Sequence, residues 1–252
     1  MTTTKQIALI TGANRGIGYE TARQLGERGF TVLVGARSAQ RGADAADKLR
    51  AEGIDARALE IDATDAAAIT RAAAWIDAEF GRLDVLVNNA GISGGAFDKP
   101  SETDVDRMRE VFETNVFGIV AVTNAMLPLL RNAPAARIVQ VSSEVGSIGF
   151  LMDQSSPMWQ AAAISYPASK AALNMVTAMY AKELWDTPIK VNAANPGYCA
   201  TDFNGNTGFR TAAQGAQVSV ELATLAEDGP TGQLWGYRWG AEDDTVLGQL
   251  PW

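Results

Sequence analysis

The sequence contains no histidine among its 252 residues. A histidine general base and a histidine metal ligand are therefore excluded, so any acid–base chemistry must come from other side chains. The single cysteine, Cys199, excludes an internal disulfide and favours a reducing compartment. Without histidine or paired cysteines, we expect no metal site.

Positive charge is also scarce, because 21 lysine and arginine residues oppose 29 aspartate and glutamate residues and leave a net charge of −8. No basic block interrupts this acidic balance, so we expect no nucleic-acid partner. Long apolar runs are missing too, and none approaches the ~20 residues that span a bilayer. Only six residues precede the first apolar stretch, which leaves no room for a signal peptide. These features predict a cytoplasmic protein with no membrane partner.

Short apolar stretches alternate with alanine-rich amphipathic stretches along the chain. The apolar stretches predict strands at residues 7–10, 31–34, 56–61, 85–87, 138–141, 190–194 and 233–235. The amphipathic stretches predict helices, among them residues 39–52, 66–80, 103–130 and 166–184. This alternation predicts a doubly wound α/β fold, with a parallel seven-stranded sheet covered by helices on both faces. No proline-rich linker or repeat divides the sequence, so we expect one domain over residues 1–252.

A glycine-rich turn follows the first expected strand. It reads Thr11-Gly12-Ala13-Asn14-Arg15-Gly16-Ile17-Gly18, and an amphipathic stretch continues from it to about Arg28. Glycines permit a tight turn and let backbone N–H groups approach a pyrophosphate, whose charge favours the positive end of a helix. Together the strand, the turn and the helix predict a dinucleotide-binding site.

Tyr166 and Lys170 are four residues apart in an expected helix, so their side chains lie on one face. A phenol with a pKa of about 10 is a poor proton donor at neutral pH, and an ammonium group about 4 Å away favours the phenolate. We therefore expect Lys170 to lower the pKa of Tyr166 toward neutral pH, as a general acid requires. The pair alone indicates little, because the same spacing occurs on many solvated helix faces.

Both motifs occur in order with Asn88-Asn89-Ala90-Gly91 and Ser143. In this combination the sequence resembles the classical short-chain dehydrogenase/reductase family over essentially its whole length. The resemblance implies the Rossmann-type strand order 3-2-1-4-5-6-7. It also implies an oxidoreductase that transfers a hydride between a nicotinamide cofactor and a carbonyl carbon.

The resemblance assigns catalytic roles to Tyr166, Ser143, Lys170 and Asn115. In that family the tyrosine supplies the proton, and the serine holds the carbonyl oxygen. The lysine tunes the tyrosine and bonds the nicotinamide ribose, while the asparagine positions a water that relays protons to the lysine. Ser142 adjoins Ser143, but alternation at a strand end lets only one of them face the site, and the family pattern selects Ser143.

The cofactor implied by the resemblance is NADP(H). The second expected strand leads to Arg37, where a fold that selects NAD places an acidic side chain on the ribose 2′-hydroxyl. Arg15 is a second basic residue, and guanidinium groups bind phosphates bidentately. Asp62 matches the residue that bonds the adenine, although an aspartate in a turn is more often a local cap. The full cofactor set implied by the resemblance is Gly12, Asn14, Arg15, Gly16, Ile17, Gly18, Arg37, Asp62, Ala63, Asn89, Ala90, Gly91, Tyr166, Lys170, Pro196, Gly197 and Thr201.

Tyr166 follows Ser143 by 23 residues, a longer gap than in many members of the family. The insertion looks like that of the carbonyl-reductase branch, which implies reversible, NADPH-dependent reduction of a free aldehyde or ketone. Because the insertion can cover the helix surface through which other members dimerise, a homo-oligomer stays open. Mostly large apolar side chains flank the motifs and predict a pocket for a hydrophobic carbonyl or alcohol substrate. The residues expected to line it are Glu144, Val145, Met152, Trp159, Tyr198 and Phe203.

Three other functions stay open. An acyl-carrier or polyketide ketoreductase would share these motifs, although the Asp-Gly-Gly ending common there is missing. A non-catalytic NADP-binding regulator would usually lack the tyrosine or the lysine, and both are present. An epimerase or dehydratase on this fold would normally need a longer C-terminal substrate domain.

Overall fold

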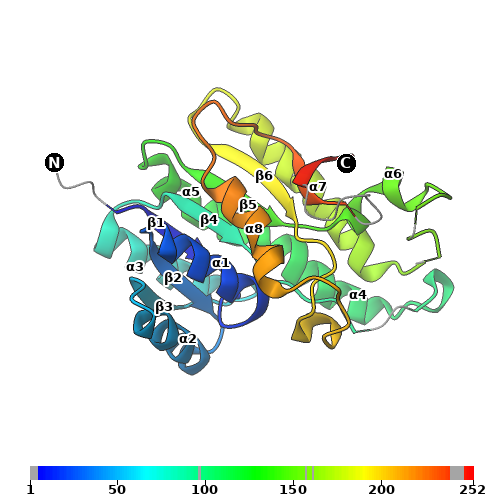
Figure 1. Cartoon of the computed structure of the whole chain (residues 1–252), viewed down its shortest axis with the longest axis horizontal. Coiled ribbons are helices and arrows are strands. Elements are labelled where there is room, and N and C mark those ends of the chain that lie inside the picture. Colours follow the sequence, from blue (N-terminus) through cyan, green and yellow to red (C-terminus); the bar gives the residue numbers. More distant parts are fainter. Residues whose placement is uncertain (1–4, 96–97, 157, 161, 239–246) are drawn as a thin grey trace.

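The computed structural model describes residues 5–95, 98–156, 158–160, 162–238 and 247–252. Figure 1 shows one twisted sheet between two layers of helices. The strands occur in the order β3-β2-β1-β4-β5-β6-β7-β8. Their bounds are β1 Ile7–Ile10, β2 Thr31–Ala36, β3 Ala56–Glu60, β4 Val85–Asn88, β5 Arg137–Val141, β6 Lys190–Asn195, β7 Leu234–Tyr237 and β8 Leu247–Leu250. The first seven strands are parallel and follow the expected order.

The eighth strand corrects the expected strand count. β8 pairs antiparallel with β7, with Leu234 opposite Leu250. Its sequence, Leu-Gly-Gln-Leu, contains no β-branched or aromatic residue, so no local pattern marks it as a strand. The strand forms because it pairs with backbone groups that the edge of β7 would otherwise leave exposed.

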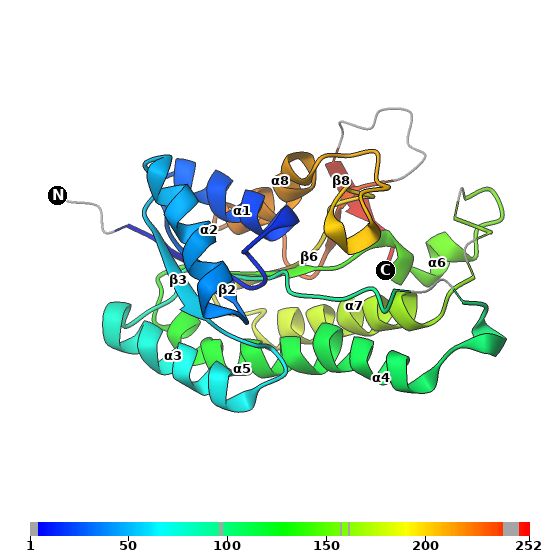
Figure 2. The same cartoon turned by 90° about the horizontal axis from the view of Figure 1, so that it is seen from below.

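The helices form one layer on each face of the sheet (Figure 2). One layer contains α3 (Ala66–Phe80), α4 (Val105–Phe112), α5 (Gly118–Arg131) and α7 (Ser165–Glu183). The other contains α1 (Gly16–Glu27), α2 (Ala39–Ala51) and α8 (Ala212–Ala223). The short helix α6 (Ile148–Leu151) lies in the insertion before α7, and 3-10 turns occupy Pro100–Glu102, Glu144–Gly146 and Asp202–Asn204.

The alternation of side chains along the strands builds a core on each face of the sheet. Leu9, Leu86 and Ile138 belong to the core shared with α3, α5 and α7. Ile10 and Val87 belong to the core shared with α1, α2 and α8. Both faces of the parallel strands are therefore buried, as the near-continuous apolar stretches predict.

The expected helix at residues 103–130 is interrupted by a single π-helical segment, Glu113–Phe117. Its Asn115 is fully buried. Gly118 follows it, and a Cβ there would lie 2.6 Å from the carbonyl oxygen of Ala63, so only glycine allows this close approach to the segment after β3. Isolated π-turns inside helices frequently occur at functional sites.

The expectation that no stretch reaches bilayer length needs a correction. The helical stretch Val105–Arg131 is long and apolar enough to cross a membrane by length and composition alone. However, 56% of its most apolar window is buried inside the protein. Its apolar side chains pack against the sheet and α3, as in the core helix of a soluble protein.

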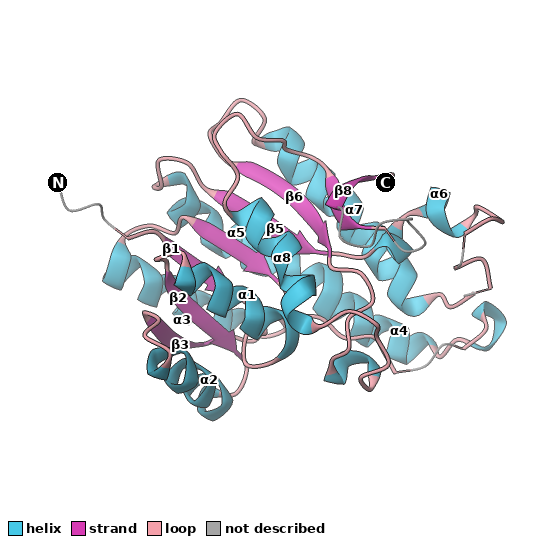
Figure 3. Ribbon diagram, in the orientation of Figure 1, coloured by secondary structure: helices cyan, strands magenta, loops and turns pink. Residues whose placement is uncertain are grey.

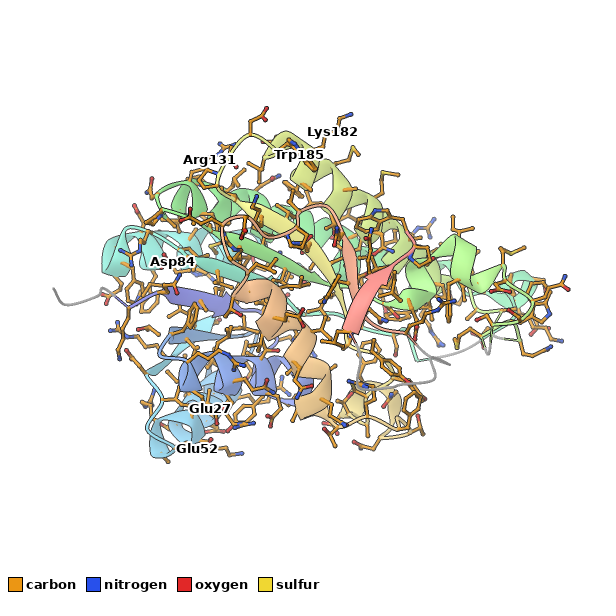
Figure 4. The ribbon with its side chains drawn as sticks, turned by 45° about the horizontal axis from the view of Figure 1, so that its top comes forward. Glu27, Glu52, Asp84, Arg131, Lys182 and Trp185 are labelled. Carbon is orange, nitrogen blue, oxygen red and sulfur yellow. The ribbon has the colours of Figure 1, made fainter. Side chains whose placement is uncertain are left out.

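Asp84 fastens the start of β1 at the end of the sheet opposite the glycine turn (Figure 4). Its buried carboxylate accepts hydrogen bonds from the backbone N–H of Ile7 at 2.8 Å and from Arg82 Nε at 3.2 Å. By contrast, Glu183 is exposed and pairs with Arg131 at 3.3 Å across α5 and α7.

We expect Asp84→Ala to lower the free energy of unfolding by about 2–3 kcal/mol, because it leaves the buried N–H of Ile7 without a partner. Denaturant titration measures the change. Glu183→Ala is the control, with an expected change within about 0.5 kcal/mol for an exposed ion pair. Equal losses in the two variants would show that Asp84 has no special role.

Candidate active site

A cavity of about 1000 Å³ lies where the loops after β1, β4, β5 and β6 meet. In Figure 3 the arrowheads of β5 and β6 point toward the side of the molecule that carries α4 and α6. Ligands of open α/β sheets bind at this carboxyl edge, where the strand order reverses. The lining comes from the glycine turn, from residues 89–95, 141–145 and 196–207, and from the first turns of α7.

The glycine turn packs tightly against the loop after β4. Gly12 and Gly16 have φ angles of +64° and +59°, which disfavour other residues. A Cβ at Gly18 would lie 2.4 Å from Asn89 Nδ2 and 2.7 Å from the carbonyl oxygen of Gly12. Asn89 Nδ2 in turn donates to the carbonyl oxygen of Thr11 at 2.8 Å. One side of the turn therefore packs against Asn89 and the sheet, and its other side lines the cavity.

The first turn of α1 faces this cavity through Gly16, Ile17 and Gly18. Within the described chain, no side chain caps the start of this helix, and no acidic residue occupies its first turn. Its N–H groups and its positive end therefore suit an anion such as a pyrophosphate. Thr201 lies across from it, with its Cγ2 3.5 Å from where a Cβ of Gly16 would be.

The two arginines lie in different surroundings. Arg15 lines the cavity, and its Nη1 pairs with Asp202 Oδ2 at 2.8 Å, which links the glycine turn to the loop after β6. Arg37 is exposed directly after β2. Asp62 Oδ1 accepts from the backbone N–H and the hydroxyl of Thr64 at 2.9 and 2.8 Å, so it forms the local turn that its sequence position also allows. Among the described residues, Asn14, Arg37, Asp62 and Ala63 do not line the cavity.

The expected tyrosine and lysine line the other end of the cavity, and the expected serine contacts the tyrosine without lining the cavity itself. Ser143 follows β5 and makes a side-chain hydrogen bond with Tyr166 on α7. Ser142 also lines the cavity, but its hydroxyl is engaged, because it donates to Asn174 Oδ1 at 2.5 Å. Lys170 Nζ lies 5.5 Å from the Tyr166 ring centre and donates to the carbonyl oxygen of Val141 at 2.8 Å. The hydrogen bond to Tyr166 favours Ser143 as the catalytic serine, and its role stays a prediction.

The pKa of Tyr166 shifts in the direction opposite to the one expected. Burial raises the pKa of this phenol above its ordinary value, and the hydrogen bond from Ser143 only partly opposes the rise. Burial also lowers the pKa of Lys170 to about 7. Burial disfavours the charged form of each group, and this cost outweighs the attraction between ammonium and phenolate that the spacing predicts.

Asn115 connects the loop after β4 to α7. Its Oδ1 accepts from the N–H of Ile92 and its Nδ2 donates to the carbonyl oxygen of Ile92, both at 2.9 Å. Nδ2 also donates to Ser169 Oγ at 3.1 Å. A Cβ at Gly91 would lie 3.2 Å from Asn115 Oδ1 and 3.9 Å from Lys170 Nζ, so Asn115 lies directly behind two residues that line the cavity.

The substrate side of the cavity differs in part from the expectation. Glu144, Val145, Tyr198 and Phe203 line it, and the Phe203 ring meets Tyr166 edge-on at 5.5 Å between ring centres. The lining within the described chain does not include Met152 and Trp159, which are 66% and 39% exposed. Nearby residues of the insertion line the cavity instead, because α6 and the turns after it direct their side chains inward. These residues are Leu151, Met158, Gln160 and Ala163.

Cys199 also lines the cavity, and the sequence analysis assigned it no role in the site. The side chain is buried against Gly215, and its Sγ lies 3.4 Å from the carbonyl oxygen of Pro196. Burial raises the pKa of this thiol to about 11, so the thiol is neutral at pH 7 and chemically quiet. Its place directly after Pro196-Gly197-Tyr198 was the signal that could have found it.

Comparison with known proteins agrees with this geometry. A model of the short chain dehydrogenase family matches residues 6–211. A short-chain dehydrogenase from Penicillium roqueforti is 37% identical over 257 residues, which cover 99% of this chain and 98% of that protein. A (+)-neomenthol dehydrogenase from Capsicum annuum is 33% identical, with 94% of this chain and 97% of that protein covered.

Among solved structures, the NADPH-bound carbonyl reductase from chicken fatty liver has a TM-score of 0.78 and 28% sequence identity. The superposition covers 91% of this chain and 95% of that chain. The family match, the strand order and the gathered serine, tyrosine and lysine agree with one another. This chain therefore belongs to the short-chain dehydrogenase/reductase family, whose members are oxidoreductases that use a nicotinamide cofactor.

Proposed function

We propose that this protein is an NADPH-dependent carbonyl reductase that converts an aldehyde or ketone to the alcohol, and that the reaction is reversible. The observation that carries the proposal is that Tyr166 and Lys170 line one end of a cavity whose other end is the glycine turn, with Ser143 hydrogen-bonded to Tyr166. The similarity to a carbonyl reductase solved with NADPH supports this reading.

The cavity fits an extended dinucleotide. The cavity extends from the glycine turn to Tyr166 and Lys170, and the uncapped start of α1 would receive the pyrophosphate. Arg37 and Arg15 would hold a 2′-phosphate, while Asn89, Ala90 and Gly91 would line the ribose. Pro196, Gly197 and Thr201 would meet the nicotinamide end, and Lys170 would bond the ribose there. When bound, the reduced nicotinamide supplies the hydride.

The side chains of the protein would handle the carbonyl oxygen and its proton. Ser143 would donate a hydrogen bond to that oxygen as its negative charge develops. Tyr166 would then transfer its phenolic proton to the oxygen, and the Lys170 ammonium would stabilise the tyrosinate that remains. Asn115 would position a water behind Lys170 for the return of the proton. In this scheme Ser143 also orients Tyr166, because the two hydroxyls are already hydrogen-bonded.

The substrate we propose is hydrophobic. Apolar side chains line the part of the cavity where the substrate carbonyl would bind beside Tyr166. They are Val145, Leu151, Met158 and Phe203. Glu144 is 4% exposed and adjoins Ser143, so its carboxylate would oppose a substrate carboxylate there. The relative that acts on neomenthol supports a small uncharged substrate of this kind. We also propose that residues 1–252 form one catalytic domain and that it works in the cytoplasm.

A substrate panel followed by NADPH absorbance tests the function. We expect kcat/KM for an aryl alkyl ketone to exceed that for a 2-keto acid of similar size by at least about 10-fold, because Coulomb repulsion from Glu144 acts on the acid alone. Glu144→Gln should narrow the ratio, and the exposed Glu113→Gln should leave it unchanged.

Other outcomes of the panel identify the alternatives. A higher rate with an acyl thioester would favour an acyl-carrier or polyketide ketoreductase. NADPH binding without turnover of any carbonyl compound would favour a non-catalytic regulator. Equal turnover of the keto acid and the ketone would contradict the proposed pocket.

Removal of the phenol of Tyr166 should stop the chemistry and spare the cofactor. Tyr166→Phe keeps the ring that contacts Phe203, so the Kd for NADPH should stay within a few-fold. Turnover should fall by at least about 100-fold, the usual size of a general-acid contribution. Tyr180→Phe is the matched control, because it removes a buried hydroxyl from the same helix away from the cavity. Near-normal turnover of Tyr166→Phe would refute the mechanism.

Cofactor choice should depend most on Arg37. Arg37→Ala should raise the Kd for NADPH by about 10- to 150-fold, the effect of one charge-assisted hydrogen bond, and should leave the Kd for NADH unchanged. Arg15→Ala should have a smaller effect, since Asp202 already shares that guanidinium. Fluorescence titration with both cofactors measures the ratio, and Arg109→Ala serves as the exposed control. A wild type that prefers NADH would overturn the assignment.

A further inference from the structure

Five polar side chains form a buried layer between the sheet and the helices α5 and α7, which lie side by side on one face (Figure 2). We call it the amide layer, and its members are Asn88, Thr123, Gln140, Ser142 and Asn174. Each is at most 3% exposed. Asn88 on β4 and Gln140 on β5 stand directly opposite each other in the sheet. Polar groups buried this deeply need hydrogen-bond partners.

Thr123 fixes how two of these amides are oriented. Its hydroxyl donates its only proton to the carbonyl oxygen of Ile119 at 2.7 Å, so toward its other neighbours it can only accept. It accepts from Asn88 Nδ2 at 3.0 Å and from Gln140 Nε2 at 3.4 Å. Both amide oxygens are therefore turned away from it. In the described chain, Asn88 Oδ1 and Gln140 Oε1 have no hydrogen-bond partner.

Asn174 supplies the complementary group. Its Oδ1 accepts from Ser142 Oγ, and its Nδ2 has no partner in the described part of the protein. Ser142 lies two residues beyond Gln140, directly after β5, where its N–H still pairs with the carbonyl oxygen of Ala194 on β6, so both side chains point to the same face of the sheet. The layer thus presents two acceptors and one donor that are not paired with one another.

A water molecule matches this arrangement in number and kind. It has two protons for the two amide oxygens and a lone pair for Asn174 Nδ2, and buried waters typically make about three such bonds. We propose that Asn88, Gln140 and Asn174 hold one buried water between β4, β5 and α7. This site differs from the proposed proton-relay water behind Lys170, because neither Asn115 nor Lys170 is among its three ligands.

The hydrated layer adjoins the residues that carry the proposed function. Asn174 lies one helical turn after Lys170, and Ser142 lies between Val141, whose carbonyl holds Lys170, and Ser143, which holds Tyr166. Asn174 is therefore a positioning residue that fixes the end of β5 against α7. This second part rests on the proposed function, whereas the water site does not.

A crystal structure at a resolution that shows ordered water tests the site directly. We expect a density peak about 2.7–3.2 Å from Asn88 Oδ1, Gln140 Oε1 and Asn174 Nδ2. A dry gap, or side chains that pair directly, would overturn the proposal. This readout needs no substrate, so it stands even where the enzyme shows no carbonyl turnover.

Asn174→Leu tests the positioning role, since it removes the donor to the water and the acceptor of Ser142 at nearly constant volume. We expect the water to be lost and kcat to fall about 10-fold or more, because small displacements of catalytic groups are costly. The Kd for NADPH should stay within about 2-fold, as no cofactor contact changes. Wild-type kcat in this variant would refute the positioning role.

Two further variants make the result decisive. Ser219→Ala removes another buried hydroxyl, one that has no partner among the described residues, from α8 on the opposite face of the sheet, and should leave kcat and the water unchanged. If Asn174→Leu does not fold, Gln140→Met removes one ligand of the water and leaves the Ser142–Asn174 pair intact. It should lower the water's occupancy and reduce kcat by a smaller factor. Full occupancy in Gln140→Met would contradict the proposed ligand set.

Discussion

The packing of α7 on the end of β5 is the constraint on which the site depends. Lys170 Nζ reaches the carbonyl oxygen of Val141 at 2.8 Å, which holds the helix to the strand through a buried donor. A Cβ at Gly146 would lie 2.6 Å from the backbone carbon of Lys170, so glycine lets the turn after β5 rest directly on the helix backbone. Ser143 and Tyr166 come from these two elements. Their hydrogen bond exists only because strand and helix approach this closely.

Periodicity in the sequence accounted for most of the fold, because buried parallel strands and amphipathic helices carry strong local signals. It failed where a segment's conformation depends on distant residues. β8 has no strand-like composition and forms by pairing with β7. The π-turn at Glu113–Phe117 continues an ordinary helical pattern, and its extra backbone residue is visible only in three dimensions. The helical stretch that contains it has the length and composition of a membrane span, which the search for long apolar runs missed, and 56% of its most apolar window is buried inside the protein.

The motifs also predicted which residues meet, and the exceptions have physical reasons. Glu144 and Phe203 line the cavity because they lie within two residues of the motif residues Ser143 and Thr201, in the same loops. Met152 and Trp159 lie in the insertion, where no regular period relates a residue to a face, and the side chains that point inward are one residue away. The four-residue spacing of Tyr166 and Lys170 predicted a lowered pKa for Tyr166, and this direction was wrong. The spacing carries no information on burial, which raises the pKa. The amide layer was invisible for a similar reason, since its members come from four separate elements.

The π-turn has a consequence for how this chain tolerates changes in length. One residue of an α-helix corresponds to about 100° of rotation. A deletion within Glu113–Phe117 that restored regular helix would therefore rotate α4 relative to α5 by about that angle. Either Asn115 would lose its hydrogen bonds to Ile92 and Ser169, or the apolar face of α5 would rotate away from the sheet. The number of residues in this segment therefore sets the rotation of α4 relative to α5. We expect its length to be fixed even where its side chains are free to vary.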